Sequence, residues 1–304
     1  MKRVGIVILH FSHKDLTSQC LDSVVKLQIT SFKLQTIVVN NNLKENLDSL
    51  KDKFPKITFL ESPKNLGFAG GNNIGIKKAL KNKNDFILII NNDTILDKNL
   101  LVSLVKTAEV KKQSGIIAPK IYFAPDHEFH HDRYQPQERG KVLWYAGGLI
   151  DWQNIICSHR GVDEVDHGQY DMLSETDFAS GCAILIKKEV FKKIGFFDEK
   201  YFLYLEDVDF CQRAKEAGFK IFYEPKAKLW HINAGSSAVG SELQDYYLGR
   251  NRLIFGLKYA SFKTKLCLVK ESLFLLWKGR TWQKTAVKDF YLRKFGQGSW
   301  LAAS

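Results

Sequence analysis

Short apolar runs alternate with segments of helical periodicity through the first part of the chain, and this alternation constrains the fold more than any other feature. Apolar residues recur at helical spacing over 16–27, 71–80 and 99–112. Strands that alternate with helices form a mostly parallel sheet that is covered on both faces. The sequence therefore predicts an α/β fold with strands at 4–9, 36–39, 57–61, 86–90 and 115–119.

The rest of the chain divides into three parts. Residues 122–175 are polar, aromatic and rich in loops. Regular structure returns with a strand and a helix over 181–197, a helix over 207–218 and a strand over 220–225. From Ser241 the pattern is helical and basic. We therefore predict an α/β domain over 1–240 and a basic helical extension over 241–304.

Basic charge is concentrated in this extension. The chain has a net charge of +12, and residues 241–304 contain twelve Lys and Arg against four Asp and Glu. Such a local excess is typical of proteins that contact a phosphate-rich ligand, a nucleic acid or an acidic membrane surface. A solvated basic helix face is the alternative interpretation.

Polar residues follow three of the predicted strands, at 10–12, 40–42 and 91–93. In open parallel sheets, ligands bind beyond the carboxyl ends of the strands. The segment "NNDT" (91–94) places Asp93 at this edge, and a hard cation that holds a diphosphate needs only one or two protein carboxylates. A strand-end turn, where Asn and Asp are common, is the alternative.

Three acidic residues begin a predicted helix in "YFLYLEDVDFCQRA" (201–214), namely Glu206, Asp207 and Asp209. The helix dipole favours ionised carboxylates at this end, and a positioned Asp can accept a proton from an attacking hydroxyl. Helix capping is the alternative, although capping alone does not explain the aromatic residues that precede Glu206.

Histidines supply a further set of candidate ligands. His231, in "LWHINAGSS" (229–237), follows a strand of the same sheet and is a candidate metal ligand, although a lone histidine is more commonly structural. His127, His130 and His131 lie close together in the middle segment. They imitate a metal site, but we favour a solvated loop there.

The stretch "NLGFAGGNN" (65–73) contains three glycines and three asparagines and leads into a helix. Bare backbone N–H groups at the start of a helix can face an anion. The stretch is neither GxGxxG nor the P-loop pattern, so neither the dinucleotide motif nor the ATPase motif applies. A tight turn that needs positive φ is the alternative.

Taken in chain order, eight segments resemble the family 2 glycosyltransferases, and most closely their bacterial rhamnosyltransferase-like branch. The resemblance covers about residues 4–258. Its segments are "VGIVILHFSHKDLTSQCLDSV", "IVVNNN", "NLGFAGGNNIGI", "ILIINNDT", "WYAGGLID", "TDFASGCAILIKKEVFKKIGFFDEKYFLYLEDVDFCQRAKEAGFKIFYEP", "LWHINAGSS" and "YYLGRNRLIFGLKY".

The resemblance implies the GT-A fold, in which a nucleotide-binding α/β domain transfers a sugar from a nucleoside diphosphate to a hydroxyl with inversion, using Mn²⁺ or Mg²⁺. It implies Asp207 as the catalytic base and Asp93 and His231 as metal ligands. Trp144 and Glu206 would lie on the acceptor side. The nucleotide-sugar contacts that it implies are His10, Asn40, Asn42, Asn65, Gly67, Asn72, Asn92, Asp93 and Arg250.

Two residues depart from the family's pattern. Asn91 replaces the first acid of the DxD metal motif, so metal binding would rest on Asp93, His231 and the diphosphate. Asn40 replaces the Asp that contacts the nucleotide base, which weakens any inference about which base is bound.

The resemblance also implies partners. The donor would be TDP- or UDP-linked, with rhamnose favoured, and the acceptor a saccharide or lipid-linked saccharide of a cell-surface polysaccharide. Residues 263–282 mix aliphatic and aromatic residues with Lys and Arg, and resemble a helix that lies on an anionic membrane. A helix packed on the domain is the alternative.

The location that we expect is the cytoplasm, with peripheral contact at the inner face of the plasma membrane. Five scattered cysteines without a CxxC pair argue against disulfides and a thiolate zinc site, and indicate a reducing compartment.

Two other functions compete with this interpretation. A nucleotidyltransferase typically has a glycine-rich loop with Arg or Lys directly after its first strand, where this chain has "HFSHKD". A nucleic-acid-binding protein would fit the charge and the 12% aromatic content, but leaves "NND", "ED" and His231 unexplained, so we expect no nucleic-acid partner. The oligomeric state stays open.

Overall fold

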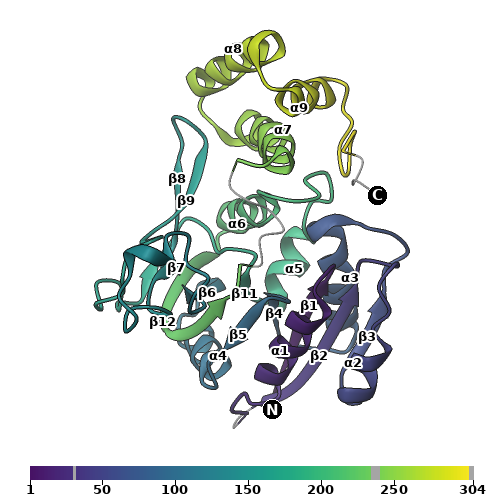
Figure 1. Ribbon diagram of the computed structural model, residues 1–304, viewed down its shortest axis with the longest axis vertical. Helices are drawn as coiled ribbons and strands as arrows, with labels where there is room; N and C mark the ends of the chain where they lie inside the picture. The colour runs from purple at the N-terminus through teal and green to yellow at the C-terminus, as the bar shows by residue number, and fades with distance from the viewer. Residues whose placement is uncertain (30–31, 234–239, 301–304) are drawn as a thin grey trace.

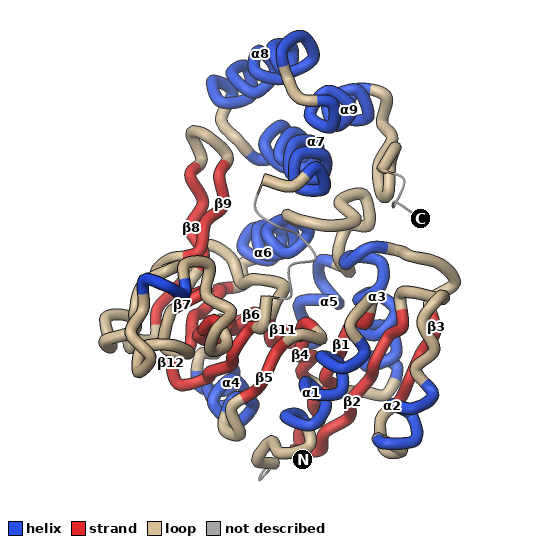
Figure 2. The backbone as a smooth tube through the Cα atoms, in the orientation of Figure 1, coloured by secondary structure: helices blue, strands red, loops and turns tan. Residues whose placement is uncertain are grey.

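The computed structural model describes residues 1–29, 32–233 and 240–300, and shows an α/β body with three helices stacked on one end (Figures 1 and 2). Within these residues the central sheet has ten strands, with a main path in the order β10-β12-β6-β11-β4-β1-β2-β3. Strands β5 and β7 pair with β12 and β6 beside this path. The predicted α/β class is confirmed.

The first half of the sheet is parallel and follows the predicted alternation. Strand β1 pairs in parallel with β2 and β4, and β2 pairs in parallel with β3. Helices cover both faces of the sheet, so β1, β4 and the second half of β2 are continuous buried apolar runs rather than alternating ones. The elements are β1 (Lys2–His10), α1 (Lys14–Val24), β2 (Phe32–Asn40), α2 (Asp48–Lys53), β3 (Thr58–Glu61), α3 (Gly67–Lys81) and β4 (Phe86–Asn91).

The second half of the sheet is mixed. Strand β11 lies antiparallel between β4 and β6, whereas β12 runs parallel to β6. Its elements are β5 (Thr94–Leu96), α4 (Leu100–Val110), β6 (Ser114–Phe123), the 3₁₀ helix η1 (His131–Arg133), β7 (Leu143–Tyr145), β8 (Gly148–Asp151), β9 (Ile156–His159), β10 (Ser174–Glu175), β11 (Ala183–Lys187), α5 (Lys188–Ile194), α6 (Glu206–Glu216) and β12 (Lys220–His231).

Three expectations from the sequence change here. Helix α3 begins at Gly67 rather than Gly71, so the glycine-rich stretch forms the first turns of the helix and not a loop before it. The strand expected over 220–225 continues to His231, because β12 shifts its register on β6 around Pro225. The middle segment, expected to be loop-rich, also contains the short strands β7 to β10.

Helices α7 (Glu242–Tyr259), α8 (Phe262–Lys278) and α9 (Thr281–Tyr291) form a helical cap above α6 (Figure 1). At the tip of the β8–β9 hairpin, Trp152 stacks on Phe255 of α7 with ring centroids 5.7 Å apart. Phe255 belongs to the same buried apolar cluster as the sheet, so α7 packs directly on the body. The division of the chain at residue 240 stays a prediction.

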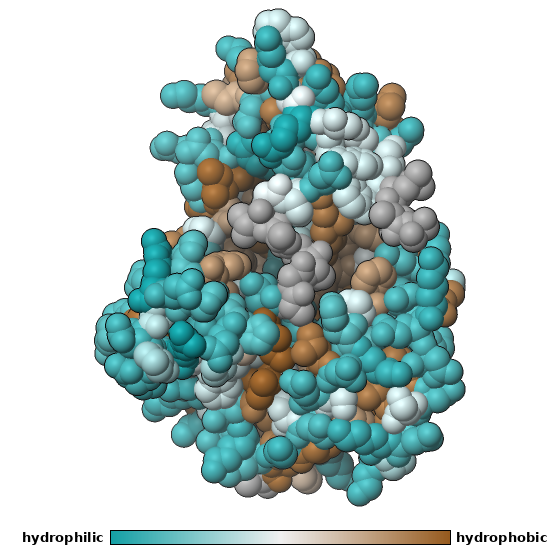
Figure 3. Space-filling model, viewed as in Figure 1, coloured by the Kyte–Doolittle hydropathy of each residue, from teal (hydrophilic) through white to brown (hydrophobic). Residues whose placement is uncertain are grey.

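Figure 3 shows a hollow between the helical cap and the body, with apolar side chains on its walls. In the part of the chain that the structure describes, no helix has both the length and the apolar character needed to cross a bilayer.

Candidate active site

Asp93 and His231 meet at the carboxyl edge of the sheet. Strand β4 ends at Asn91, and the chain turns into β5, whose Thr94 pairs with His231 of β12. The Asp93 carbonyl accepts a hydrogen bond from the Ile232 amide at 2.8 Å. This pairing brings Oδ1 of Asp93 within 3.2 Å of Nε2 of His231, with only 16% and 7% of the two side chains exposed.

The spacing of this pair fits a divalent cation. Oxygen and imidazole ligands lie roughly 2.0–2.2 Å from such ions, so two adjacent ligands of an octahedral ion are about 3 Å apart. The 3.2 Å between Asp93 and His231 is close to that value. No group of three or more His, Cys, Asp or Glu that could hold a metal occurs among the described residues. Asp93 and His231 would be two ligands of such a cation, which commonly takes its others from phosphate and water.

Trp144 of β7 lies beside this pair. Its ring packs edge-on against His231, with centroids 4.7 Å apart, and against His159, with centroids 4.3 Å apart. Burial lowers the pKa of His159 to about 4, so this ring is neutral at neutral pH and adds no charge next to His231. Trp144, expected on the acceptor side, thus forms a wall of the candidate metal site.

His10 and Asn92 brace the loop that follows β1. The two ring nitrogens of buried His10 contact Thr17 Oγ1 at 2.8 Å and Glu45 Oε2 at 2.7 Å. Burial lowers the pKa of His10, although Glu45 opposes the shift. Asn92 Nδ2 donates to the Ser12 carbonyl and to Thr17 Oγ1, both at 2.9 Å. Both residues lie at the predicted edge, with these polar atoms engaged within the protein.

Asn40 and Asn42 shape the turn after β2. Asn40 Nδ2 donates to the Glu45 carbonyl at 2.9 Å, and its Oδ1 accepts the Asn42 amide at 3.1 Å. Asn42 Nδ2 in turn donates to the Phe11 carbonyl at 2.9 Å. These bonds hold the loops after β1 and β2 together. Both loops lie at the carboxyl edge of the sheet, as expected for neighbouring parallel strands.

Asn41 joins this turn to the glycine-rich stretch, a role that the motif match did not assign. Its Nδ2 donates to Asn65 Oδ1 at 3.1 Å and to the Gly67 carbonyl at 3.2 Å. Its Oδ1 accepts the Leu66 amide at 3.0 Å. Asn65 Oδ1 also accepts the Gly67 amide at 2.9 Å. A run of three asparagines after a strand is the only signal in the sequence for this clasp.

The glycines of α3 permit close packing within the protein. Gly67 has φ of +67°, and a Cβ there would lie 2.4 Å from the Phe202 carbonyl oxygen. At Gly71 and Gly75 an added Cβ would lie within 2.5 Å of side chains of β1. Asn72 is fully buried, and its Nδ2 donates to a carbonyl one turn earlier. These glycines therefore let the start of α3 pack closely against the body and against Phe202.

The acids at the start of α6 have contrasting surroundings. Burial, followed by the charge of Asp207, raises the pKa of Glu206 well above its ordinary range. Asp209 is also buried, and burial alone would raise its pKa. Arg213 at 2.7 Å and Lys258 at 2.9 Å instead hold the pKa of Asp209 below its ordinary value.

Two opposing effects act on the pKa of Asp207. Its Oδ2 accepts the Gly181 amide at 2.7 Å, and its Oδ1 accepts the Val208 amide at 2.8 Å. Burial raises the pKa of Asp207, and these two amides oppose the shift because they stabilise the carboxylate. Cys182 follows Gly181 in the chain, and its carbonyl accepts a hydrogen bond from the Asn91 amide at 2.9 Å. Two consecutive residues thus connect Asp207 to the turn that carries Asp93.

The segment that presents these acids, residues 201–205, has an unusual backbone. Phe202, Tyr204 and Leu205 have φ of +66°, +70° and +67°. Each such residue costs on the order of 1 kcal/mol, so the surroundings must hold this conformation in place. We call residues 201–205 the presenting loop.

Arg250 lies behind the presenting loop rather than at the edge with Asp93. It has no exposed surface, and its Nη2 donates to the carbonyls of Tyr201 at 3.0 Å and Lys200 at 3.2 Å. The phosphate contact that the resemblance implied for Arg250 stays a prediction. It braces the backbone that leads to Asp207.

The histidine cluster of the middle segment is paired with acids. His131 lies 2.9 Å from Asp132, His130 lies 3.5 Å from Asp163, and about half of each histidine side chain is exposed. These pairs are consistent with the solvated loop that we favoured.

Residues 2–246 match the sequence profile described as "Glycosyltransferase like family 2". This match covers most of the chain, and the chain belongs to the family 2 glycosyltransferases. The structure is similar to the crystal structure of GalNAc-T7 with UDP, GalNAc and Mn²⁺, with a TM-score of 0.60 at 15% identity over 89% of this chain and 54% of that chain. The predicted GT-A fold is thereby confirmed.

Individual relatives carry glycosyltransferase names. The chain is 28% identical over 166 residues to the low-salt glycan biosynthesis hexosyltransferase Agl10 of Haloferax volcanii, covering 54% of this chain and 48% of the relative. It is 25% identical over 234 residues to the rhamnosyltransferase WbbL of Escherichia coli, covering 75% and 83%. It is 41% identical over 194 residues to the N-acetylglucosaminyl-diphospho-decaprenol L-rhamnosyltransferase of Mycobacterium tuberculosis, covering 61% and 62%.

The aligned region therefore spans about half of the Haloferax protein and about three fifths of the mycobacterial one. These names do not favour the nucleotidyltransferase or the nucleic-acid-binding interpretation.

Proposed function

We propose that this chain moves a sugar from a nucleoside-diphosphate sugar to a hydroxyl of a saccharide acceptor, with inversion, in the synthesis of a cell-surface polysaccharide. The observation that carries this proposal is the connection of Asp207 to the Asp93–His231 pair through Gly181 and Cys182. An in-line displacement needs a base on one side of the anomeric carbon and a held diphosphate on the other.

Asp207 is the base in this proposal. The amides of Gly181 and Val208 fix the orientation of its carboxylate and leave further lone pairs for an acceptor hydroxyl. Burial raises its pKa, which makes it a stronger base. As the acceptor oxygen bonds to the anomeric carbon, the carboxylate takes the hydroxyl proton and the bond from that carbon to the diphosphate breaks.

Asp93 and His231 are the residues that would hold Mn²⁺ or Mg²⁺. Such a cation supplies positive charge to the leaving diphosphate. The loops after β1 and β2 and the first turns of α3 would form the neighbouring donor pocket, with His10, Asn40, Asn42, Asn65, Gly67, Asn72 and Asn92 at its walls. The donor would be a TDP- or UDP-linked sugar. L-rhamnose is favoured because two of the relatives are named rhamnosyltransferases.

A thermal-shift screen tests the donor and the metal together. TDP-L-rhamnose and a set of UDP-sugars would each be added with Mn²⁺ or with EDTA, since a ligand that binds the folded state raises Tm by mass action. We expect one donor to raise Tm with Mn²⁺, and Asp93→Ala to abolish this rise.

The matched control is Asp132→Ala, which removes the carboxylate of another Asp–His pair, on the exposed loop. This variant should keep the full rise. If no nucleotide sugar raises Tm, the donor assignment is contradicted, and a rise that survives both EDTA and Asp93→Ala would contradict the metal assignment.

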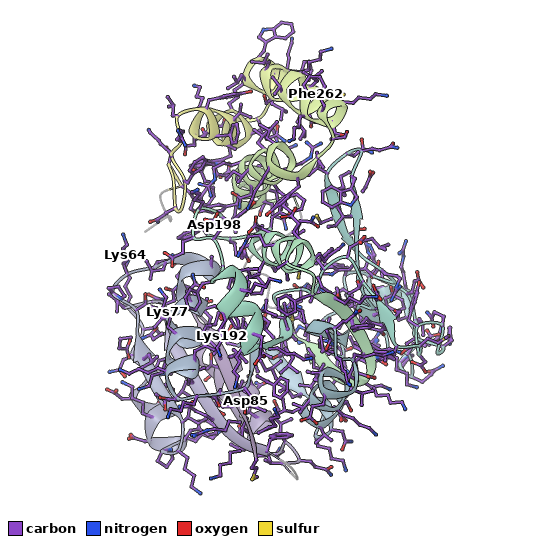
Figure 4. The ribbon with its side chains drawn as sticks, turned by 180° about the vertical axis from the view of Figure 1, so that it is seen from behind. Lys64, Lys77, Asp85, Lys192, Asp198 and Phe262 are labelled. Atoms are coloured by element: carbon purple, nitrogen blue, oxygen red, sulfur yellow. The ribbon has the colours of Figure 1, made fainter. Side chains whose placement is uncertain are left out.

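We further propose that the acceptor is lipid-linked and that α8 contacts an anionic bilayer. Five large apolar residues of α8 are exposed by 49–77%: Phe262, Leu266, Leu273 and Trp277 form a stripe along the helix, and Phe274 lies beside it. The opposite face packs inward through Leu268 and Ser272. Figure 4 shows Phe262 on the cap, at the far end of the molecule from Asp85.

The charged residues of α8 indicate what the apolar stripe contacts. Lys263, Lys265, Lys270 and Lys278 accompany it on α8, against the single acid Glu271. An apolar stripe with flanking lysines matches an interfacial helix on anionic lipid, where each lysine near the surface is worth about 1 kcal/mol. Helix α8 also packs on α7 and α9, so this proposal does not require α8 to leave the domain.

Vesicle flotation tests this contact. We expect binding to phosphatidylcholine vesicles that contain phosphatidylglycerol and little binding to vesicles without it. Leu273→Ser with Trp277→Ser should abolish binding, whereas Met172→Ser, at an exposed residue of the body, should not. If the double variant changes the oligomeric state and leaves flotation intact, the stripe is a contact between copies and the membrane proposal is wrong.

A further inference from the structure

The presenting loop has its backbone carbonyls gathered on one buried side chain. Nδ2 of Asn251 lies 2.9 Å from the carbonyl oxygen of Tyr201 and 2.8 Å from those of Leu203 and Tyr204. Asn251 is fully buried and comes from α7, about 50 residues later in the chain. A single amide group therefore reaches three of the five carbonyls in the loop.

The same loop contacts the glycine-rich start of α3 on its other side. The Phe202 carbonyl accepts the Ala69 amide at 3.2 Å, and its oxygen lies 2.4 Å from the point where a Cβ on residue 67 would be. The ring of Phe202 stacks on Tyr247 of α7, with centroids 5.2 Å apart. The loop is thus held between α3 and α7.

The loop sets the direction of α6. Leu205, with φ of +67°, is the N-cap residue of α6, and no side chain caps this end of the helix. The Leu205 carbonyl accepts the Asp209 amide at 2.9 Å as the first turn begins. Glu206 and Asp207 follow at once, so the backbone at Leu205 decides where the carboxylate of Asp207 points.

We infer that Asn251, supported by Arg250, is a positioning residue for Asp207. It holds the presenting loop in its left-handed conformation and so keeps Asp207 on the Gly181 amide. The inference rests on the proposed function, in which Asp207 is the base and a TDP-linked sugar is the donor. The helical cap would then set the geometry of the reaction centre in addition to any contact with a membrane.

Asn251→Ala in the full chain is the test. We expect the kcat for TDP release from TDP-L-rhamnose with Mn²⁺ to fall about 100-fold, because displacement of a catalytic group by about 1 Å has an effect of that size. The KM for the donor should change by no more than about threefold, because none of the proposed donor contacts lies in the presenting loop.

Hydrogen exchange gives a readout that does not need turnover. In the native protein the Gly181 and Val208 amides donate to Asp207. In Asn251→Ala they should lose this acceptor and exchange at least about tenfold faster at unchanged global stability. Asn251→Ser, which keeps one hydroxyl donor, is the milder variant if Asn251→Ala does not fold, and should show the same changes at smaller size.

The matched control is Asn84→Ala. Asn84 is another buried amide, whose Nδ2 donates to the Ala79 carbonyl and to Gln35 at the opposite end of β1. This variant should lose stability but keep kcat and the exchange rates of Gly181 and Val208. If Asn251→Ala matches this control in both readouts, the positioning role is wrong. If Asp207→Asn keeps full activity while the exchange result holds, Asp207 is not the base, but Asn251 still positions the presenting loop.

Discussion

The two carboxylates of the candidate site are placed by different means. Asp93 follows a buried strand, and the pairing of Thr94 with His231 fixes its position. Asp207 begins a helix after a loop with three left-handed residues, and Asn251 and Arg250 hold this loop from the helical cap. The first position depends on the register of neighbouring strands, and the second on side chains about 50 residues away.

The position of Asp93 should therefore be less sensitive to single substitutions than the position of Asp207. A strand register is enforced along its whole length, because a slip by one residue would turn every side chain to the other face. The presenting loop has no such redundancy, since a few hydrogen bonds from α7 offset its unfavourable backbone. We therefore expect substitutions of the residues that hold the presenting loop to change the reaction, and substitutions of Asp93 to act mainly through the cation.

The largest expected effect is on the base itself. Asp207→Asn should lower the rate of sugar transfer by about 10³-fold, because general-base catalysis typically contributes 10²–10⁴-fold. Donor binding, measured by thermal shift with Mn²⁺, should be retained.

The control for this variant is Asp85→Asn. Asp85 accepts the Arg3 amide at 3.0 Å and pairs with Lys188 at the other end of the sheet (Figure 4). It should alter stability only. A transfer rate within tenfold of the native protein for Asp207→Asn would remove Asp207 from the role of base.

The next largest effect is expected on stability, at Asp209. Asp209→Asn would leave Arg213 and Lys258 without the buried carboxylate that they share, and breaking such a pair costs about 3 kcal/mol or more. Urea unfolding followed by circular dichroism measures this loss.

Asp48→Asn is the comparison for this loss. Asp48 pairs with Lys51 on the surface, where water screens the pair, so this change should cost much less stability than Asp209→Asn. Equal losses in the two variants would show that the network around Asp209 does not tie α6 to α7.

For Asp93, which follows a strand, the expected effect is weaker binding of the cation. Asp93→Asn should raise the Mn²⁺ concentration for half-maximal activity by about 100-fold, since even outer-sphere partners of metal ligands are worth 10–100-fold. The activity at saturating Mn²⁺ should recover most of its native value. A fall in activity that excess Mn²⁺ does not relieve would contradict the division of roles between Asp93 and Asp207.

The same comparison explains what the sequence could predict. Periodicity and strand order predict the α/β fold, and the rule that ligands lie at carboxyl strand ends brings Asp93 and His231 together. The site around Asp207 was located only by its motif. No local rule predicts left-handed Phe202, Tyr204 and Leu205, because their conformation depends on tertiary contacts with Asn251.

Arg250 is another residue whose surroundings could not be predicted from the sequence. Its charge and motif indicated a phosphate contact, but the structure buries it against backbone carbonyls. Residues such as Arg250 and Gly181 take their roles from which loop packs beside them, and a single sequence does not contain that information.

The smallest expected effect is a change in the pH dependence of stability at Glu206. Burial first, and then the charges of Asp207 and Asp209, raise the pKa of Glu206. The folded protein therefore binds this proton more tightly than the unfolded chain, so the free energy of unfolding falls as pH rises above the ordinary Glu pKa of about 4.3. One proton limits this slope to about 1.4 kcal/mol per pH unit. Glu206→Gln keeps the shape and removes the ionisation, so its stability relative to the native protein should increase from pH 5 to pH 8. Urea titrations at these two pH values measure the difference, and a constant difference would mean that Glu206 is already ionised in the folded protein.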